Sequence, residues 1–196
     1  MSAPLSDGAK PKTPKTEDQA EPGLLLEVWD WIKAVVVAMT VIILLHQYGF
    51  HLSTVKGASM EPTLTEGEWL FINKTIQYLG TPERGDIVVV RDPSGMDSPH
   101  PYLVKRVVAV GGDEVQIIRG KLLVNGAEVK ESYIDSPIED GRFEPLTVME
   151  GTVFVMGDNR HRSASHDSRS FGPVPVGQIE GRAEWIVWPL AKWSRL

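Results

Sequence analysis

The chain has 196 residues, 42% of them hydrophobic, and a formal net charge of −6. This length suits one membrane segment plus one modest folded domain, or a single larger domain. The negative charge and the lack of a basic stripe argue against a general nucleic-acid-binding protein, and the lack of cysteine excludes disulfides, thiolate catalysis and cysteine-bound metals.

The first expected element is an apolar helix near the N-terminus. Residues 1–22 are rich in Pro, Lys, Ser, Thr, Asp and Glu, and we expect a disordered tail there because they hold too little apolar surface to offset their ordering entropy. The apolar run from Ala34 to Leu45 is shorter than the roughly 20 residues of a membrane span. We nevertheless predict an anchor helix in residues 23–51, because aromatic residues suited to membrane interfaces lengthen the run, namely Trp29, Trp31, Tyr48 and Phe50.

This apolar run has two alternative interpretations, a buried core helix and the apolar region of a cleaved signal peptide. The long acidic leader and the lack of a small-x-small site after Leu45 disfavour the signal peptide. Lysines before the run give a weak positive-inside bias, since acidic residues count little in that rule. The expected topology is therefore a single span of the cell membrane, with the N-terminus cytoplasmic and the following domain on the outer side.

From residue 52 onward, short β-branched and aromatic runs separated by Gly and Pro turns predict a mainly-β domain over residues 52–196, like a sandwich or barrel. Arg119-Gly120 and Asn125-Gly126 are turn signals that predict a meander. Residues 92–101 and 132–146 are expected to be exposed loops. The expected strands cover residues 69–72, 87–90, 104–110, 115–118, 121–124, 152–156 and 185–188.

Ser59 and Lys105 carry the strongest chemical signal. A serine hydroxyl needs a nearby base to act as a nucleophile at neutral pH. A lysine is such a base only when it is neutral, which requires burial among apolar groups. Lys105 lies in the apolar, β-branched run 102–108. The pair favours a Ser-Lys hydrolase, although a turn serine and a solvent-facing strand lysine are the ordinary alternatives.

Residues 155–172 form a third segment, dense in Gly, Asp, Asn, Arg and Ser. Because side chains alternate along a strand, Lys105 and Arg106 face opposite sides, and one consistent arrangement turns Lys105 inward and Arg106 toward a carboxylate. Two ion pairs are expected to brace the site, Arg106 with Asp158 and Arg169 with Asp167.

The histidines favour neither a catalytic triad nor a metal site. Ser165, His166 and Asp167 are sequence neighbours, and adjacent residues do not easily align hydroxyl, imidazole and carboxylate in a relay. The five histidines also lack metal-ligand spacing. We expect no metal and no cofactor.

Four sequence blocks follow the apolar helix in an order that one protein family shares. They are residues 57–64 (GASMEPTL), 84–90 (RGDIVVV), 105–113 (KRVVAVGGD) and 157–172 (GDNRHRSASHDSRSFG). Through these blocks the chain, from about residue 25 to 190, resembles the bacterial type I signal peptidases, membrane-anchored serine endopeptidases that remove signal peptides from exported preproteins. The resemblance implies an antiparallel β-sheet catalytic domain of the signal-peptidase/LexA-like type.

The resemblance also implies residue roles. Ser59 would be the nucleophile, Lys105 the general base, and the Ser59 backbone N–H part of the oxyanion hole. The implied partners are the lipid bilayer and preprotein signal peptides with small residues at positions −1 and −3, bound in extended form at a sheet edge. The implied pocket lining is Val55, Met60, Leu64, Val104 and Met156.

Two departures from the family pattern leave questions open. Position 57, where some members carry a serine that donates to the oxyanion, is a glycine. Six residues separate Arg160 from Asp167, two more than in the family pattern. Counting back from Asp167 assigns Ser165 as the hydroxyl that orients the lysine, and counting forward from Arg160 assigns Ser163. We favour Ser165, because an insertion just after Arg160 leaves the Asp167 region in register.

Two rival function classes fit part of the pattern. A LexA-like Ser-Lys autoprotease shares the chemistry, but such proteins are soluble, whereas this chain has an apolar run near its N-terminus. A membrane-anchored binding module without activity would not need both Ser59 and Lys105. Three tryptophans are candidates for contact with the bilayer, with core packing as the alternative for the first two: Trp185, Trp188 and Trp193.

Overall fold

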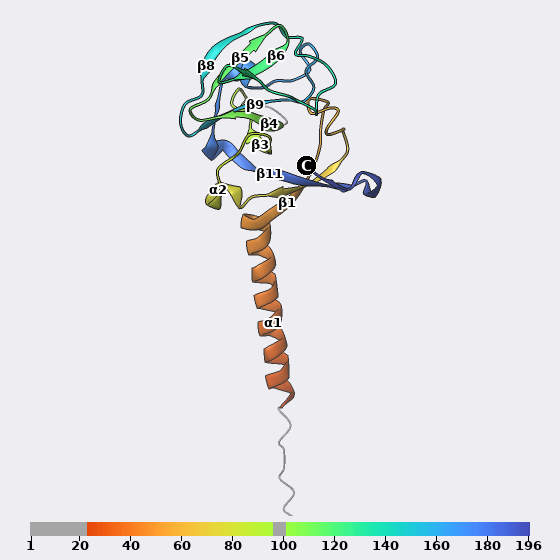
Figure 1. Ribbon diagram of the computed structural model, residues 1–196. Coiled ribbons are helices and arrows are strands. Elements are labelled where there is room, and N and C mark those ends of the chain that lie inside the picture. Colours follow the sequence, from red (N-terminus) through yellow and green to blue (C-terminus); the bar gives the residue numbers. More distant parts are fainter. Residues whose placement is uncertain (1–22, 96–100) are drawn as a thin grey trace, which may run out of the picture. The chain divides into compact units, whose positions relative to one another are not determined.

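The structure is a computed structural model that describes residues 23–95 and 101–196 (Figure 1). The chain divides into two units, of which the first ends at Val41 and the second starts at Ile42. The expected tail, residues 1–22, lies outside the described residues, as does the middle of the expected loop 92–101.

A long apolar helix begins in the N-terminal unit. Helix α1 (Leu24–Leu44) continues into a π-helical segment, η1 (Leu45–Gly49). The Thr40 hydroxyl donates to the Val36 carbonyl oxygen at 2.8 Å, so this polar group is satisfied within the helix. Within Leu26–Gly49, an 18-residue stretch has a mean hydropathy of 2.1, and the segment is long and apolar enough to cross a membrane. By length and composition the helix is a candidate span.

The second unit consists mainly of antiparallel strands in two sheets. The larger sheet has the order β1-β2-β11-β3-β4-β9-β10, with β12 beside β11, and the smaller has the order β7-β6-β5-β8. The predicted fold class, mainly antiparallel β with one apolar N-terminal helix, is confirmed. The larger sheet comprises β1 (Phe50–Thr54), β2 (Trp69–Asn73), β3 (Ile87–Arg91), β4 (Tyr102–Val110), β9 (Thr152–Met156), β10 (Val174–Pro175), β11 (Ile179–Trp188) and β12 (Ser194–Arg195). The smaller comprises β5 (Glu114–Ile118), β6 (Lys121–Val124), β7 (Ala127–Glu128) and β8 (Phe143–Thr147).

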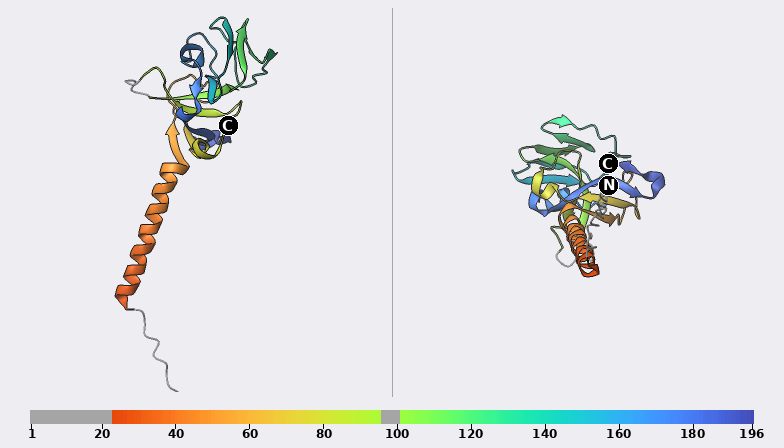
Figure 2. Two further views of the ribbon diagram at one scale, coloured as in Figure 1. Left: turned by 90° about the vertical axis from the view of Figure 1, so that its left-hand side faces the viewer. Right: turned by 90° about the horizontal axis from the view of Figure 1, so that it is seen from below.

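Within this unit, the smaller sheet and the β1–β2 edge of the larger sheet lie at opposite ends. Strands β5, β6 and β8 occupy one end, β1 and β11 the other, and β3, β4 and β9 lie between them (Figures 1 and 2). Short helical turns complete the fold, namely α2 (Ile76–Leu79), α3 (Ser168–Phe171), η2 (Val176–Gln178) and η3 (Leu190–Lys192). Strand β4 therefore runs through the middle of the unit.

The predicted meander forms the hairpins of the smaller sheet. Arg119 and Gly120 have φ values of 52° and 77°, and Asn125 and Gly126 have 54° and 77°. Positive φ at both central residues is what a two-residue type I′ turn requires. The turn residues therefore set the register of β5, β6 and β7.

The seven expected strands all lie within observed strands, but the expectation that residues 132–146 form an exposed loop is wrong in part. Phe143–Thr147 forms β8, and Ile138 is buried. Strand β8 contains Pro145 and, among the described strands, pairs only with β5, an edge position where a proline removes no needed ladder bond. The first half of β11 was also not predicted, because Gly181 and Ala183 are weak strand formers. A Cβ at Gly181 would lie 2.6 Å from the Ile72 Cγ2, so the glycine allows β2 and β11 to approach.

Three clusters of buried side chains form the core of the second unit. One fills the space between the smaller sheet and β9, and another packs around β3, β4 and β9. The third joins the segment after β1 to β2, β3 and β11, and it includes Val55, Met60 and Leu64. Full burial of such a side chain contributes about 1.5–3 kcal/mol. The chain on both sides of Ser59 is therefore anchored by core packing.

Candidate active site

Ser59 lies in the connection from β1 to β2. It follows the exposed residues Gly57 and Ala58 and precedes Met60, which is buried. Met60 and Leu64 form one turn, in which the N–H of Leu64 donates to the Met60 carbonyl oxygen at 2.9 Å. The buried side chains of Met60 and Leu64 thus hold the turn against the core, while Ser59 itself is only half-buried.

Lys105 lies in β4, and its side chain contacts the Ser59 hydroxyl. Its side chain is nearly inaccessible, with the residue 2% exposed, and its Nζ lies 2.6 Å from the Ser59 Oγ. Burial lowers the pKa of Lys105 from 10.5 to about 8, and the nearby carboxylate of Asp167 opposes this effect. About a tenth of the molecules would therefore hold a neutral amine at pH 7. Distance and protonation state both suit a base that accepts the Ser59 proton.

Arg106 is adjacent to Lys105 but is paired with a carboxylate. Its Nε and Nη2 donate to the two carboxylate oxygens of Asp158 at 2.9 and 2.7 Å. Asp158 is completely buried and also accepts a 2.6 Å hydrogen bond from the Thr63 hydroxyl. Through Asp158, Arg106 of β4 is therefore connected to Thr63, four residues after Ser59. The ion pair compensates both buried charges.

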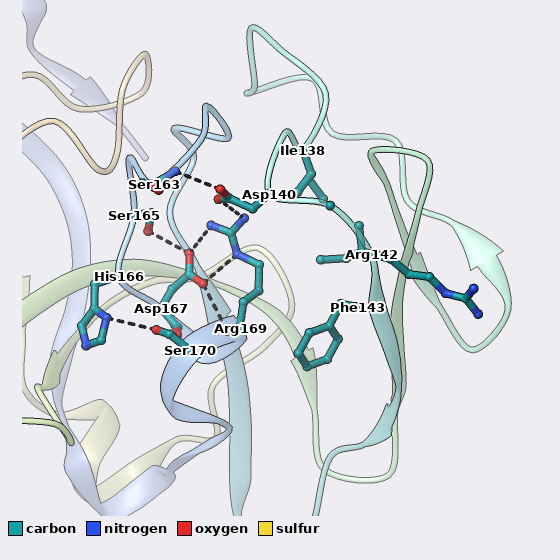
Figure 3. Close-up of a pocket in the computed structure, with 12 residues that line it drawn as sticks. Ile138, Asp140, Arg142, Phe143, Ser163, Ser165, His166, Asp167, Arg169 and Ser170 are labelled. Atoms are coloured by element: carbon teal, nitrogen blue, oxygen red, sulfur yellow. Dashed lines mark hydrogen bonds and ion pairs between the residues drawn. The ribbon is translucent and has the colours of Figure 1, made fainter.

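A second bidentate ion pair joins Arg169 to Asp167 (Figure 3), and both charges are close enough to affect the pKa of Lys105. The Nε and Nη2 of Arg169 each donate to Asp167 at 2.8 Å, and Nη1 donates to Asp140 at 3.0 Å. Burial raises the pKa of Asp167, but the hydrogen bonds from Arg169 and Ser165 outweigh it and hold this pKa below its usual value. Asp167 is therefore a carboxylate at neutral pH, held by its neighbours.

The two candidate orienting serines have different surroundings. The Ser165 hydroxyl donates to Asp167 Oδ2 at 2.8 Å (Figure 3). A Cβ at Gly157 would lie 2.3 Å from both the Ser165 Oγ and the Ser59 carbonyl oxygen, so Ser165 and Ser59 flank the same glycine. Ser163 is exposed, and its N–H donates to Asp140. Of the two serines, Ser165 is the one beside Ser59 and the buried carboxylate.

The backbone N–H of Ser59 is the implied oxyanion donor. Within residues 23–95 and 101–196 it has no hydrogen-bond acceptor. Gly57 has a φ of 79°, a left-handed conformation that favours glycine. A serine at this position would be strained, which gives a conformational reason for the missing side-chain donor.

A groove of about 610 Å³ is lined by Ser59 and Lys105. One wall is β1 with the segment that follows it, and the other is the start of β4. Of the expected pocket residues, Val55, Met60 and Val104 line the groove. Leu64 and Met156 do not. Both are completely buried, Leu64 in the cluster beneath Ser59 and Met156 in the cluster under the smaller sheet.

His166 does not link Ser165 to Asp167 in a relay; its carboxylate partner is Asp92, whose Oδ1 lies 3.7 Å from the His166 Nε2. Its Nδ1 lies 3.0 Å from the Ser170 Oγ and its Nε2 lies 2.7 Å from the Ser94 Oγ, whereas Ser165 bonds to Asp167 directly (Figure 3). In the described part of the chain, no group of three His, Asp or Glu side chains is arranged to hold a metal ion.

Asn159 is a contact residue that the sequence patterns do not single out. Its N–H donates to the Ser59 carbonyl oxygen at 3.1 Å, and its Nδ2 donates to the Ala58 carbonyl oxygen at 3.0 Å. Asn159 thus holds the backbone of the serine turn from the segment that carries Asp158. The available signal was the polar run that follows Gly157, but no spacing rule linked it to residue 59.

A half-buried serine beside a buried, low-pKa lysine in a groove is the arrangement expected of Ser-Lys hydrolases. Comparison with known proteins agrees. The family described as "Signal peptidase, peptidase S26" matches residues 28–188. Signal peptidase I of Bacillus licheniformis is 36% identical over 172 residues, which cover 83% of this chain and 89% of that protein. The chain belongs to the signal peptidase family, peptidase S26, as its sequence blocks predicted.

Two further relatives by sequence agree with this assignment. Signal peptidase I T of Bacillus subtilis (strain 168) is 37% identical over 170 residues, covering 82% of this chain and 85% of that protein. The probable thylakoidal processing peptidase 2 of Arabidopsis thaliana is 38% identical over 167 residues, covering 83% of this chain and 44% of that protein. Among solved structures, a crystal structure of a signal peptidase I from Enterococcus faecalis V583 matches with a TM-score of 0.44. The match covers 52% of this chain and 96% of that chain, and the two sequences are 30% identical.

Proposed function

We propose that this chain is a membrane-bound serine endopeptidase that cleaves N-terminal signal peptides from exported preproteins, with Ser59 and Lys105 as its catalytic dyad. The observation that carries the proposal is the 2.6 Å separation of the Ser59 Oγ from the Nζ of a lysine that is 2% exposed. Membership of the signal peptidase family supports the substrate class.

In the proposed reaction, neutral Lys105 accepts the Ser59 proton as the Oγ attacks the scissile carbonyl carbon. The resulting oxyanion accepts a hydrogen bond from the Ser59 backbone N–H. Lys105 then donates its proton to the leaving amine, and the signal peptide remains as an ester on Ser59. A water molecule, deprotonated by Lys105, hydrolyses the ester and regenerates the serine.

Ser165 is the proposed orienting hydroxyl for Lys105. Its hydrogen bond to Asp167 fixes the rotation of the hydroxyl, and Arg169 in turn fixes Asp167. This arrangement leaves the lone pairs of the Ser165 oxygen available to a lysine N–H. The ion pairs of Arg106 with Asp158 and of Arg169 with Asp167 are therefore proposed as braces of the site.

The substrate is proposed to bind as an added β-strand. Among the described residues, β1 pairs only with β2, and residues Tyr102–Lys105 of β4 pair only with β3. Both of these strands border the groove, so an extended peptide can bond to their free backbone edges. Val55, Met60 and Val104 would narrow the groove for small side chains at positions −1 and −3.

The proposed membrane arrangement has a tail at residues 1–22 in the cytoplasm, an anchor at 23–51 and a peptidase domain at 52–196 on the outer side of the cell membrane. Trp185, Trp188 and Trp193 are 38%, 55% and 67% exposed and are proposed to contact the lipid bilayer. Protease protection in sealed inside-out vesicles tests the topology. The domain should be protected, and its digestion would reject the orientation.

The dyad is tested with purified full-length protein and a preprotein substrate. Ser59→Ala and Lys105→Ala should each abolish cleavage, because one removes the nucleophile and the other the base. Lys121→Ala is the matched control, since Lys121 is an exposed lysine paired with Glu128 at the protein surface. Near-normal cleavage by either dyad variant would reject the mechanism.

A further inference from the structure

The connection between β7 and β8, expected to be an exposed loop from residue 132, carries two side chains that contact the buried arginines Arg160 and Arg106. Glu131, just before that loop, has a side chain that is 4% exposed and pairs with the completely buried guanidinium of Arg160. The Nη1 of Arg160 donates to Glu131 Oε2 at 2.9 Å, and Nη2 donates to Oε1 at 2.5 Å. This carboxylate therefore compensates a charge that has no access to water.

Arg160 connects this ion pair to the serine turn. Its Nε donates to the Gly157 carbonyl oxygen at 2.7 Å, which closes the segment 157–160 on itself. From the same segment Asn159 bonds to the carbonyl oxygens of Ser59 and Ala58. Hydrogen bonds thus connect Glu131 to the backbone of Ser59 through the single short segment 157–160.

Tyr133 connects the same carboxylate to the second buried arginine. Its hydroxyl donates to Glu131 Oε1 at 2.8 Å, and its ring lies 4.0 Å from the Arg106 Cζ, a cation–π distance. Burial raises the pKa of the Tyr133 phenol, so this group stays a protonated donor. Since Arg106 is bonded to Asp158, the tyrosine supports the segment 157–160 from a second side.

Removal of Glu131 would leave the Arg160 guanidinium buried without a counter-charge. A guanidinium does not deprotonate in proteins, so it must move toward water or toward another acceptor. Its movement would pull on the Gly157 carbonyl and on Asn159. A displacement of about 1 Å at a reacting group lowers a rate about 10²-fold.

We propose that Glu131 and Tyr133 are positioning residues of the peptidase, which hold the segment 157–160 so that Asn159 keeps Ser59 opposite Lys105. The proposal rests on the proposed function. Neither residue lines the groove, so neither acts on the substrate.

Steady-state cleavage of a synthetic signal-peptide substrate tests the proposal in the full-length protein, alongside thermal unfolding. Glu131→Gln should lower kcat at least about tenfold with KM changed less than about threefold, because transition-state geometry is lost and the groove is not. Tyr133→Leu should also lower kcat about tenfold, and Tyr133→Phe, which keeps the ring over Arg106, less. Glu128→Gln, an exposed carboxylate at the end of β7, is the control and should match wild type.

A double variant separates positioning from stability. In Glu131→Gln with Arg160→Gln no buried charge is left unpaired, so the melting temperature should recover, while kcat stays low because the contact with Gly157 is lost. Recovery of kcat together with the melting temperature would overturn the proposal, as would wild-type kcat in Glu131→Gln.

If Glu131→Gln does not fold, the two Tyr133 variants test the proposal in its place. Wild-type kcat in Tyr133→Leu would overturn the proposal. Ser59→Ala in the same assay tests the proposed function separately from the positioning role. If Ser59→Ala still cleaves the substrate, the proposed function is wrong. If Ser59→Ala is inactive while the Glu131 and Tyr133 variants have wild-type kcat, only the positioning role is rejected.

Discussion

The two sides of the proposed active site hold their buried cations in opposite ways. On the groove side, Lys105 is buried and contacts the Ser59 hydroxyl, and it makes no ion pair within the described residues. On the opposite side, Arg106, Arg160 and Arg169 are each held by a carboxylate through two hydrogen bonds.

This difference determines which cation can lose its proton. Burial without a bonded carboxylate brings the pKa of Lys105 down to about 8. A lysine's pKa shifts readily on burial, whereas a guanidinium remains charged, so the arginines can serve as fixed braces. Two of the carboxylates near Lys105, Asp158 and Asp167, are instead engaged by arginines.

The largest effect should come from removing the unpaired cation. Lys105→Met should reduce kcat/KM by at least about 10²–10⁴-fold, the usual range for loss of a general base. The same variant should be more stable at pH 7 by about 2 kcal/mol, because a buried charge is replaced by an apolar side chain of similar length. Cleavage assays and urea unfolding measure the two effects. A loss of stability would show that Lys105 is not buried at an energetic disadvantage.

Removing a paired cation should have the opposite effect on stability. Arg106→Met leaves Asp158 buried without its partner and should reduce the free energy of unfolding by about 3–5 kcal/mol. The control is Arg142→Met, whose ion pair with Glu144 is exposed and should contribute less than about 1 kcal/mol. Equal free energies of unfolding for the two variants would mean that the buried ion pair of Arg106 contributes no more to stability than the exposed ion pair of Arg142.

Ser165 is the hydroxyl proposed to orient Lys105. On that proposal, Ser165→Ala should reduce kcat about 10- to 10²-fold, because the base loses a neighbour that limits its orientation. Ser163→Ala should change kcat less than about twofold, since Ser163 is exposed and bonds through its backbone to Asp140. Steady-state kinetics of the two variants at one pH make the comparison. Equal, mild effects would mean that neither hydroxyl orients Lys105.

The pKa of Lys105 predicts the pH dependence of both activity and stability. Since the base must be neutral, kcat/KM should fall about tenfold per pH unit below about pH 8 and level off above it. A lowered pKa means that the unfolded chain binds more protons between about pH 8 and 10.5, so this group adds stability as pH rises through that window. The gain is about 3 kcal/mol, at about 1.4 kcal/mol per unit. It should be absent from Lys105→Met, and a pH–rate profile with its midpoint near 10 would contradict the assignment.

The smallest effect concerns the oxyanion side. Gly57→Ser should not raise kcat and should lower stability by about 1–3 kcal/mol, because the φ of 79° is unfavourable for a residue with a Cβ. Gly57→Ala has the same backbone strain without a hydroxyl and is the matched control. Higher kcat for the serine variant than for the alanine variant would mean that the hydroxyl reaches the oxyanion despite the strain.

The amino-acid sequence by itself determined the local features of this protein. Apolar runs and β-branched residues predicted the N-terminal helix and seven strands, because these signals depend only on neighbours along the chain. The type I′ turns at Gly120 and Gly126 were predictable for the same reason. Ser59, Lys105 and the four blocks in order predicted the family, since their residue types and order are visible without coordinates.

Only the tertiary structure decided which side chains meet. Ser165 and Ser59 flank Gly157, a proximity that sequence spacing alone did not reveal for either candidate serine. Leu64 and Met156 looked like pocket residues but fill the core, because the direction of a side chain depends on how its segment packs. Glu131 and Tyr133 showed no local signal at all. Their effect comes from the burial of Arg160 and Arg106, and burial is a property of the folded chain.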